Sequence, residues 1–212
     1  MPRRTDHDAR RRRIAAALWR VAAHQGFDAV SLRHVAAEAR VSMGQVQHYF
    51  RTKDEMLRFA LDAVSERVAE RIGLRIAALT NDGRGNPHAL VRAVLVELLP
   101  LDEARRLEAY VGFAFLTRAT VQPAIAAGLR EQYRQLHEFL AGQIRDGQRA
   151  GRTPADFDAD REAVALLALV DGLAAHVLVD KHAQPAALAA FDGHLRRLFP
   201  NGSEAGRAVS ES

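Results

Sequence analysis

The sequence predicts an all-α chain of about nine helices, in which a small three-helix head precedes a larger helical body. Of the 212 residues, 48% are hydrophobic but only 6% are aromatic, and alanine, leucine, arginine and glutamate dominate. These residue types favour helix, whereas β-branched runs of strand length are scarce. Capping residues and prolines also recur at the edges of segments whose apolar residues have helical spacing.

Composition narrows the possible classes of protein. The chain has no cysteine, which excludes disulfides and thiol-based sensing and makes a reducing cytoplasm the expected location. The longest apolar run, residues 163–170, ends at Asp171 and is too short to span a bilayer, so no membrane partner is expected. The N-terminal residues lack the apolar stretch of a secretory signal. No enzyme motif is present and the nine histidines are scattered, so neither catalysis, a metal site nor a cofactor is expected.

The charge of the chain is concentrated at its N-terminal end. Residues 1–53 hold 11 lysines and arginines against 4 acidic residues, a net charge of +7, whereas the remainder holds 19 against 22, a net charge of −3. A basic head on a slightly acidic body indicates that the head meets a polyanion.

The first helix is expected over about residues 8–24, after a polar arm at residues 1–8. Its apolar positions lie on one face: Ile14, Leu18, Val21 and Ala22. Gly26 is expected to end the helix, and Phe27 is available to fill the small core of the head.

Residues 31–50 predict two short helices, 32–39 and 43–49, joined by a tight turn. Ser31 suits the N-cap of the first helix, whose buried stripe is Leu32, Val35, Ala36 and Ala39. Ser42 and Gln45 have capping-box spacing at the start of the second. The positions expected to point inward are Val41, Val46 and Phe50.

The outward face of the second short helix carries Gln45, Gln47, His48 and Tyr49, with no lysine, arginine or glutamate. Glutamine can pair with an adenine edge, and tyrosine and histidine suit phosphates or thymine methyls. The pattern is that of a helix-turn-helix whose second helix enters the DNA major groove. The alternative from these twenty residues alone is an ordinary αα-hairpin of a helical bundle.

The remaining helices are expected at about residues 53–79, 87–100, 102–119, 123–150, 159–179 and 185–199, with a disordered tail at 201–212. Thr52 and Glu55 predict a capping box, Asn86 and Asp158 predict N-caps, and Pro100 predicts a stop. The helix at 159–179 is apolar nearly all round, which indicates a central or interface position.

The run GFDAVSLRHVAAEARVSMGQVQHYFRTKDEML, residues 26–57, resembles the signature of the tetracycline-repressor (TetR) family of bacterial transcription regulators. Its HYF ending is most similar to the BetI-like branch. Arg40 departs from the pattern, because the family usually has glycine at this turn position. Since arginine adopts left-handed backbone only at a cost, we expect the turn to be shaped differently here.

The resemblance implies three functional regions: a helix-turn-helix DNA-binding domain at 1–53, an effector-binding and dimerisation domain at 54–200, and the tail at 201–212. It implies a homodimeric repressor that binds a near-palindromic operator in double-stranded DNA and is released by a small, largely apolar effector. The expected DNA-binding residues are Arg3, Arg4, Ser31, Ser42, Met43, Gly44, Gln45, Gln47, His48, Tyr49 and Lys53.

The family places an effector pocket in the body and forms its dimer through the last two helices. The pocket candidates are Phe59, Leu95, Leu98, Tyr110, Phe113, Thr117, Tyr133, His137 and His176. The dimer-interface candidates are Leu167, Val170, Ala174, Ala175, Leu178, Leu188, Phe191 and Leu195. An effector is expected to act by moving the helix at 53–79. The alternatives are an activator, a regulator without a small effector, or a non-enzymatic helical interaction protein with a basic arm.

Overall fold

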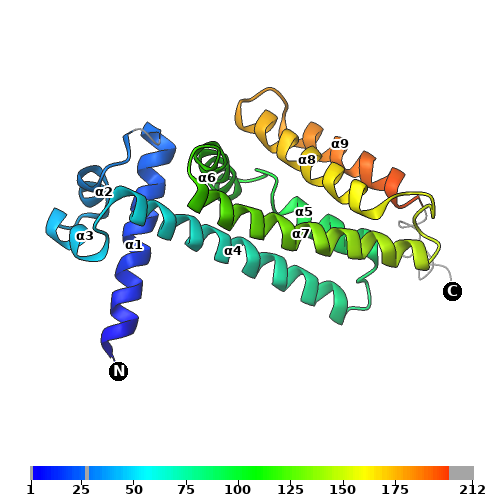
Figure 1. Cartoon of the computed structure of the whole chain (residues 1–212), viewed down its shortest axis with the longest axis horizontal. Coiled ribbons are helices and arrows are strands. Elements are labelled where there is room, and N and C mark those ends of the chain that lie inside the picture. The colour runs from blue at the N-terminus through cyan, green and yellow to red at the C-terminus, as the bar shows by residue number, and fades with distance from the viewer. Residues whose placement is uncertain (1, 27–28, 201–212) are drawn as a thin grey trace. The chain divides into compact units, whose positions relative to one another are not determined.

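The computed structural model describes the backbone of residues 2–26 and 29–200, and the side chains in these ranges except those of residues 2–8, 23, 24 and 124. These residues form helices and no strands (Figure 1). The helices are α1 (Pro2–Gln25), α2 (Leu32–Ala39), α3 (Met43–Tyr49), α4 (Lys53–Asn81), α5 (Pro87–Val96), α6 (Glu103–Ala119), α7 (Pro123–Arg149), α8 (Ala159–Leu178) and α9 (Gln184–Leu198).

The chain forms two compact units. Unit 1 comprises Met1–Ala69 and Tyr110–Phe115, and unit 2 comprises Glu70–Ala109 and Leu116–Ser212. Helices α4 and α6 therefore each contribute residues to both units. The functional boundary after residue 53 stays a prediction, because compactness and function need not divide a chain at the same place.

The core of unit 1 is largely the predicted one, although Leu32 and Val41, which were expected inside, are only partly buried. Ile14, Leu18, Val21 and Ala22 of α1 are all buried, and so are Val35, Ala36 and Ala39 of α2. Phe50 follows α3 and is also buried, with its ring centroid 5.4 Å from that of Phe59 on α4. The guanidinium of Arg11 lies over both rings, 4.3 Å from the Phe59 centroid, so an arginine of α1 closes this core by cation–π contact.

Most predicted helix boundaries are confirmed to within two residues, and α2 and α3 match the predicted ranges. The start of α1 was wrong: the helix begins at Pro2 rather than near Asp8, because proline suits the first helical position and no residue before Asp8 breaks the helix. The predicted polar arm at residues 1–8 is thus largely helical in its backbone. The end of α5 was also wrong, since the helix stops at Val96, four residues before Pro100. Phe27 and the tail at 201–212 lie outside the described residues.

Unit 2 is a layered helical bundle in which α7 packs against α5 and α8, and α8 packs against α9 (Figure 1). Its fully buried side chains include Leu95 of α5, Leu140 and Ile144 of α7, Leu166 of α8 and Phe191 of α9. No helix in the described part of the chain is long and apolar enough to cross a lipid bilayer.

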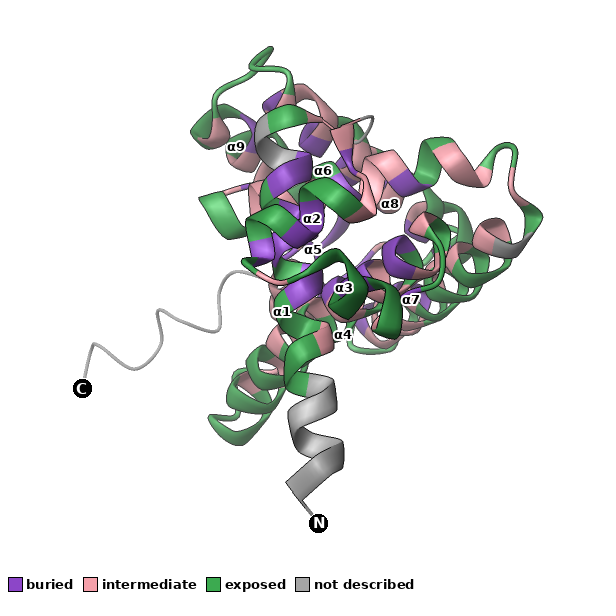
Figure 2. Cartoon of the chain, turned by 90° about the vertical axis from the view of Figure 1, so that its left-hand side faces the viewer, coloured by how far each residue is buried: buried purple, intermediate pink, exposed green. Residues whose placement is uncertain are grey.

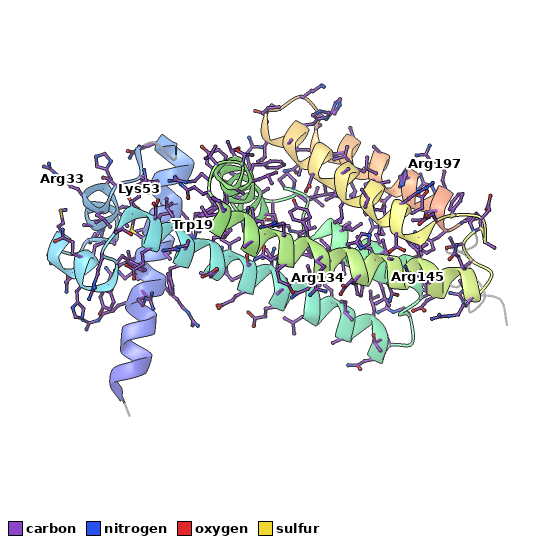
Figure 3. The ribbon with its side chains drawn as sticks, viewed as in Figure 1. Trp19, Arg33, Lys53, Arg134, Arg145 and Arg197 are labelled. Carbon is purple, nitrogen blue, oxygen red and sulfur yellow. The ribbon has the colours of Figure 1, made fainter. Side chains whose placement is uncertain are left out.

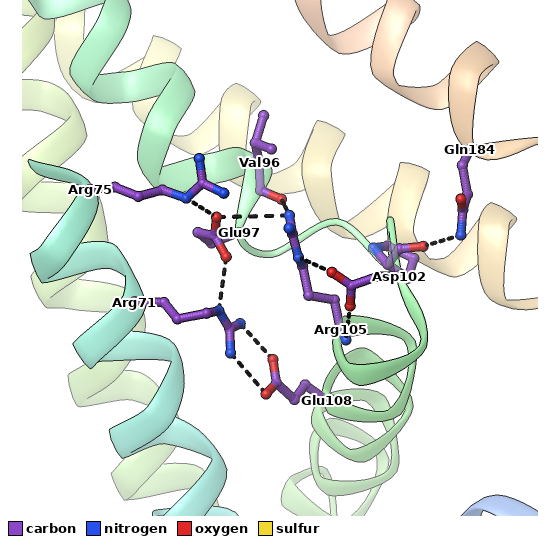
Figure 4. Close-up of polar contacts among 9 residues, drawn as sticks. Arg71, Arg75, Val96, Glu97, Asp102, Arg105, Glu108 and Gln184 are labelled. Atoms are coloured by element: carbon purple, nitrogen blue, oxygen red, sulfur yellow. Dashed lines mark hydrogen bonds and ion pairs between the residues drawn. The ribbon is translucent and has the colours of Figure 1, made fainter. Parts of the chain in front are cut away.

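A buried ionic network ties α4 to the α5 terminus and to α6 within unit 2 (Figure 4). Arg71 on α4 donates from Nε to Glu97 Oε2 at 2.9 Å, and from Nη1 and Nη2 to the two carboxylate oxygens of Glu108 at 3.0 and 2.6 Å. The Glu97 carboxylate also pairs with Arg75 and lies 3.8 Å from Nη1 of Arg105. The Glu97 side chain is fully buried and that of Glu108 is 6% exposed, so both charges depend on these arginines.

Candidate nucleic-acid interface

Helix α3 begins with the predicted capping box. Ser42 Oγ accepts the backbone N–H of Gln45 at 3.1 Å, and Gln45 Oε1 accepts the backbone N–H of Ser42 at 3.1 Å. Val46 is buried on the inner face of the helix. Phe50 caps the C-terminal end of the helix by donating its backbone N–H to the carbonyl of Val46. The seven-residue helix is therefore fixed at both ends and by one apolar anchor.

The opposite face of α3 is exposed, as Figure 2 shows. Met43 is 43% exposed, and Gly44, Gln45, Gln47 and His48 are also in the exposed class, whereas Tyr49 is partly exposed. The rings of His48 and Tyr49 meet edge to face, with their centroids 5.2 Å apart. The face offers amides, aromatic edges and a bare backbone at Gly44, which is a set of groups suited to base edges and phosphates.

The two amides of this face are not equivalent. Gln45 Oε1 already accepts the backbone N–H of Ser42 in the capping box, and this bond holds the amide toward the start of its own helix. The side chain of Gln47 makes no hydrogen bond among the described residues. A bidentate adenine pair needs both the oxygen and the nitrogen of one amide, and this requirement favours Gln47.

The turn between α2 and α3 keeps a left-handed residue although it has no glycine there. Arg40 has φ 55° and ψ 48°, and its N–H caps the α2 carbonyls of Ala36 and Ala37. The following residue, Val41, donates its N–H to the Ala36 carbonyl at 3.0 Å. The expectation of a differently shaped turn was therefore wrong: the αL cap is retained, and Arg40 bears its steric cost.

Helix α2 is also fixed at its N-terminus, where Ser31 Oγ accepts the N–H of His34 at 3.1 Å and leaves its own hydroxyl proton free to donate. His34 Nδ1 lies 2.6 Å from the Ala29 carbonyl. Arg20 of α1 pairs with Glu38 of α2 at 2.5 Å, so the single described acid of the head is already neutralised.

Arg33 and Arg40 are exposed and form no ion pair among the described residues, and Arg33 extends outward from α2 in Figure 3. These two cations were not among the predicted contacts.

The other predicted phosphate contacts lie at helix starts. Lys53 is the first residue of α4 and is partly exposed. The start of α4 is held by Thr52 Oγ1, which accepts the N–H of Glu55 at 3.1 Å, while the Glu55 carboxylate accepts the N–H of Arg51 at 2.9 Å. Arg3 and Arg4 belong to the first turns of α1, and their side chains lie outside the described residues.

The predicted pocket residues are divided between the units. Phe59, Tyr110 and Phe113 belong to unit 1; Leu95, Leu98, Thr117, Tyr133, His137 and His176 belong to unit 2. Leu95 is fully buried in the core, and the others are partly or more fully exposed.

Three of the unit 2 candidates make separate polar or ring contacts. Tyr133 donates its hydroxyl to Asp171 Oδ2 at 2.9 Å, His137 Nε2 lies 3.2 Å from the Asp160 carbonyl, and His176 stacks edge-on against His182 at 5.1 Å. Asp171 was not predicted as a site residue. The signal for it was a lone acid inside an apolar helix.

The predicted dimer-interface residues fall into two groups. Val170, Ala174, Phe191 and Leu195 are buried inside unit 2 and are therefore already packed within the chain. The others are partly exposed: Leu167, Ala175, Leu178 and Leu188. A different stripe of α8 faces outward with small or apolar residues, namely Val164, Ala165, Ala168 and Gly172, and the C-cap Val179 that follows the helix is also exposed. On α9 the exposed positions include Ala186, Ala189 and Ala190.

Comparison with known proteins matches both parts of the chain to one family. Residues 14–60 match the model described as bacterial regulatory proteins of the TetR family, and residues 87–200 match the model described as the C-terminal region of a BetI-type transcriptional repressor. The HTH-type transcriptional regulator PksA of Bacillus subtilis is 35% identical over 185 residues, which cover 85% of this chain and 84% of PksA.

Solved structures show the same relationship. A transcriptional regulator from Rhodococcus sp. RHA1 is 36% identical with a TM-score of 0.71, covering 88% of this chain and 96% of its own. A regulator from Saccharomonospora viridis, solved in complex with choline, is 28% identical with a TM-score of 0.73, covering 89% and 94%. Together with the capped, outward-facing α3, these matches show that the chain is a non-enzymatic, DNA-binding transcriptional regulator that belongs to the TetR family, with a C-terminal region of the BetI type.

Proposed function

We propose that the chain acts as a homodimeric repressor that binds a near-palindromic operator and is released from it by a small effector. The observation that carries the DNA-binding part is the outward face of α3, which is exposed, free of acidic residues and rich in amides. Two such heads related by a two-fold axis would reach half-sites in successive major grooves, roughly 35 Å apart.

In this proposal the contacts divide into base readers and phosphate binders. Gln47 reads an adenine edge with both ends of its amide, and Gln45, His48 and Tyr49 contribute further base-edge contacts. The phosphate binders are Ser31, Ser42, Lys53, Arg3 and Arg4, joined by the exposed cations Arg33 and Arg40.

The dimer is proposed to form through the outward stripe of α8 and the alanine-rich face of α9. Val164 and Val179 are 58% and 72% exposed, and Ala168 and Gly172 between them let a second helix approach closely. No described residue of the single chain covers this apolar face, and its burial against a second copy would remove it from water.

A small effector is supported by the relative that was solved with choline, whose fold matches this chain over most of its length. We propose that α4 carries the response, since it is one continuous helix whose first half belongs to unit 1 and whose second half belongs to unit 2. Effector and operator must then weaken each other's binding by the same factor, typically worth about 1–3 kcal/mol.

The decisive experiment selects bound sequences from random duplex DNA with the full-length protein. We expect a near-palindrome whose half-sites are about one helical turn apart. Gln47→Ala should then relax the preference at one base position per half-site and cost about 1–3 kcal/mol on the selected site. Lys53→Ala should weaken all sequences alike and lower the salt dependence by about one counterion per head. Equal losses on selected and random DNA for both variants would refute this division of roles.

A further inference from the structure

Helix α8 of unit 2 carries one carboxylate in its apolar middle. Asp171 interrupts the otherwise apolar stretch of α8 at residues 163–175. Its Oδ2 accepts the hydroxyl of Tyr133 at 2.9 Å, and no arginine, lysine or histidine pairs with it among the described residues. Burial raises the pKa of Asp171, and burial together with the neighbouring carboxylate raises the pKa of Tyr133. A half-buried negative charge is thus held by a single neutral hydrogen bond, which is a costly arrangement.

The cations closest in sequence on α7 are engaged with other groups. Arg130 donates from Nε to the carbonyl of Ala126 at 3.3 Å, and Arg134 pairs with Glu131 and Glu138. His137 lies against Asp160, near the start of α8. Helix α7 therefore provides no counterion for Asp171 among its described side chains.

The surroundings of the pair are apolar and incompletely covered. The Tyr133–Asp171 bond joins one face of α7 to one face of α8, so residues one turn away on each helix flank it. These are Leu129 and Leu136 on α7 and Leu167 on α8, and all three are partly exposed rather than buried. The Asp171 carboxylate therefore lies within an apolar surface whose leucine side chains remain partly exposed and could be covered by a ligand.

We propose that Asp171 and Tyr133 anchor a binding site for a small organic cation: an amine or quaternary ammonium group that carries an apolar body. The carboxylate supplies the missing opposite charge, the tyrosine ring offers a π face, and the flanking leucines cover the apolar body. The inference rests on the proposed effector response and specifies the effector's chemistry, replacing a largely apolar molecule by an amphiphilic cation.

The test uses a matched pair of probes with the full-length protein. The cation is 2-phenylethylamine, which is protonated at pH 7, and its neutral counterpart is 2-phenylethanol. Affinities are measured by calorimetric titration. We expect the amine to bind at least tenfold more tightly than the alcohol. Asp171→Asn should remove that advantage while leaving the affinity for the alcohol unchanged, because asparagine retains the acceptor for Tyr133 but not the charge.

Asp160→Asn is the matched control, because Asp160 is an exposed acid on the same helix and should leave the affinity for the amine unchanged. Equal affinity of wild type for the two probes, no binding of the amine at millimolar concentration, or full amine affinity in Asp171→Asn would each overturn the proposal. Thermal unfolding of the ligand-free variants guards against misfolding. Since the charged form of Asp171 is the costly one, Asp171→Asn should unfold at the same or a higher temperature than wild type at pH 7. A large fall would mean that a second copy of the chain neutralises Asp171, and would also overturn the proposal.

Operator binding with the same probes separates this inference from the proposed function. If the amine binds through Asp171 but operator affinity does not change, the cation site stands and the effector response fails. If operator affinity responds equally to both probes and is unaltered by Asp171→Asn, the response stands and the cation site fails.

Discussion

Removing Arg71 should destabilise unit 2 far more than removing an arginine that makes a similar number of ion pairs at the surface. Arg71 bridges Glu97 and Glu108, whose side chains are 0% and 6% exposed. Arg134 on α7 bridges Glu131 and Glu138, whose side chains are 52% and 60% exposed. The comparison therefore varies burial while holding the chemistry of the pairing nearly constant.

The magnitude follows from what remains after the change. Breaking a buried ion pair by removing one partner costs roughly 3–5 kcal/mol, because the other charge stays buried. In Arg71→Ala, Glu97 keeps Arg75 and Arg105, whereas Glu108 loses its bidentate partner. Since Arg71 itself is 33% exposed, water can compensate in part, and we expect a loss of about 2–4 kcal/mol.

The assay is urea unfolding followed by far-ultraviolet circular dichroism at a fixed protein concentration. With a slope of about 2 kcal/mol per molar urea, the midpoint of Arg71→Ala should fall by roughly 1–2 M. Arg134→Ala should shift the midpoint far less, and 1 M NaCl should remove its small effect but not that of Arg71→Ala. Adding Glu108→Gln to Arg71→Ala should restore part of the loss by removing the unpaired charge. Equal midpoints for the two single variants would refute the argument from burial.

Three further outcomes are expected. Arg40→Gly should raise the free energy of unfolding by about 0.5–1 kcal/mol, because glycine adopts the left-handed turn without the steric cost. Arg40→Ala, which keeps the same strain, is the control. Equal free energies of unfolding for the two variants in chemical unfolding would contradict the reasoning. Ala168→Arg on the outward stripe of α8 should give a monomer, measured by light scattering, that binds operator weakly. The control, Ala77→Arg on the exposed side of α4, should remain a dimer. A dimeric Ala168→Arg variant would argue against the proposed interface. Burial and the charge of Arg92 lower the pKa of His88, so the folded state binds fewer protons than the unfolded state. The free energy of unfolding should therefore fall as pH drops from about 7 through the unfolded-state pKa of His88 towards its folded-state pKa. His88→Gln should flatten this part of the stability profile, and an unchanged slope would exclude His88 as its source.

The head shows how far local sequence information reaches. The bounds of α2 and α3, the Ser31 cap and the Ser42–Gln45 capping box were all predicted from residues no more than seven positions apart. Hydrogen bonds and apolar stripes of helices connect neighbours in the chain, so they can be read without knowing the tertiary structure. The prediction of the turn shape at Arg40 was wrong because packing between helices outweighed a local preference. The local preference of arginine is against left-handed backbone, but the packing of α2 against α1 and α3 imposes it.

Within unit 2, the sequence predicted where the helices are and the tertiary structure decided what they bring together. Arg71 meets Glu97 and Glu108 across 26 and 37 residues, and Tyr133 meets Asp171 across 38. The apolar pattern of α8 predicted Ala174 as an interface residue and did not single out Ala168, yet Ala174 is buried against the chain's own helices and Ala168 faces outward. Periodicity fixes the residues that share a helix face, but the neighbour of that face depends on how distant segments pack. Because helix packing is set by the summed fit of many side chains, no local pattern carries that choice.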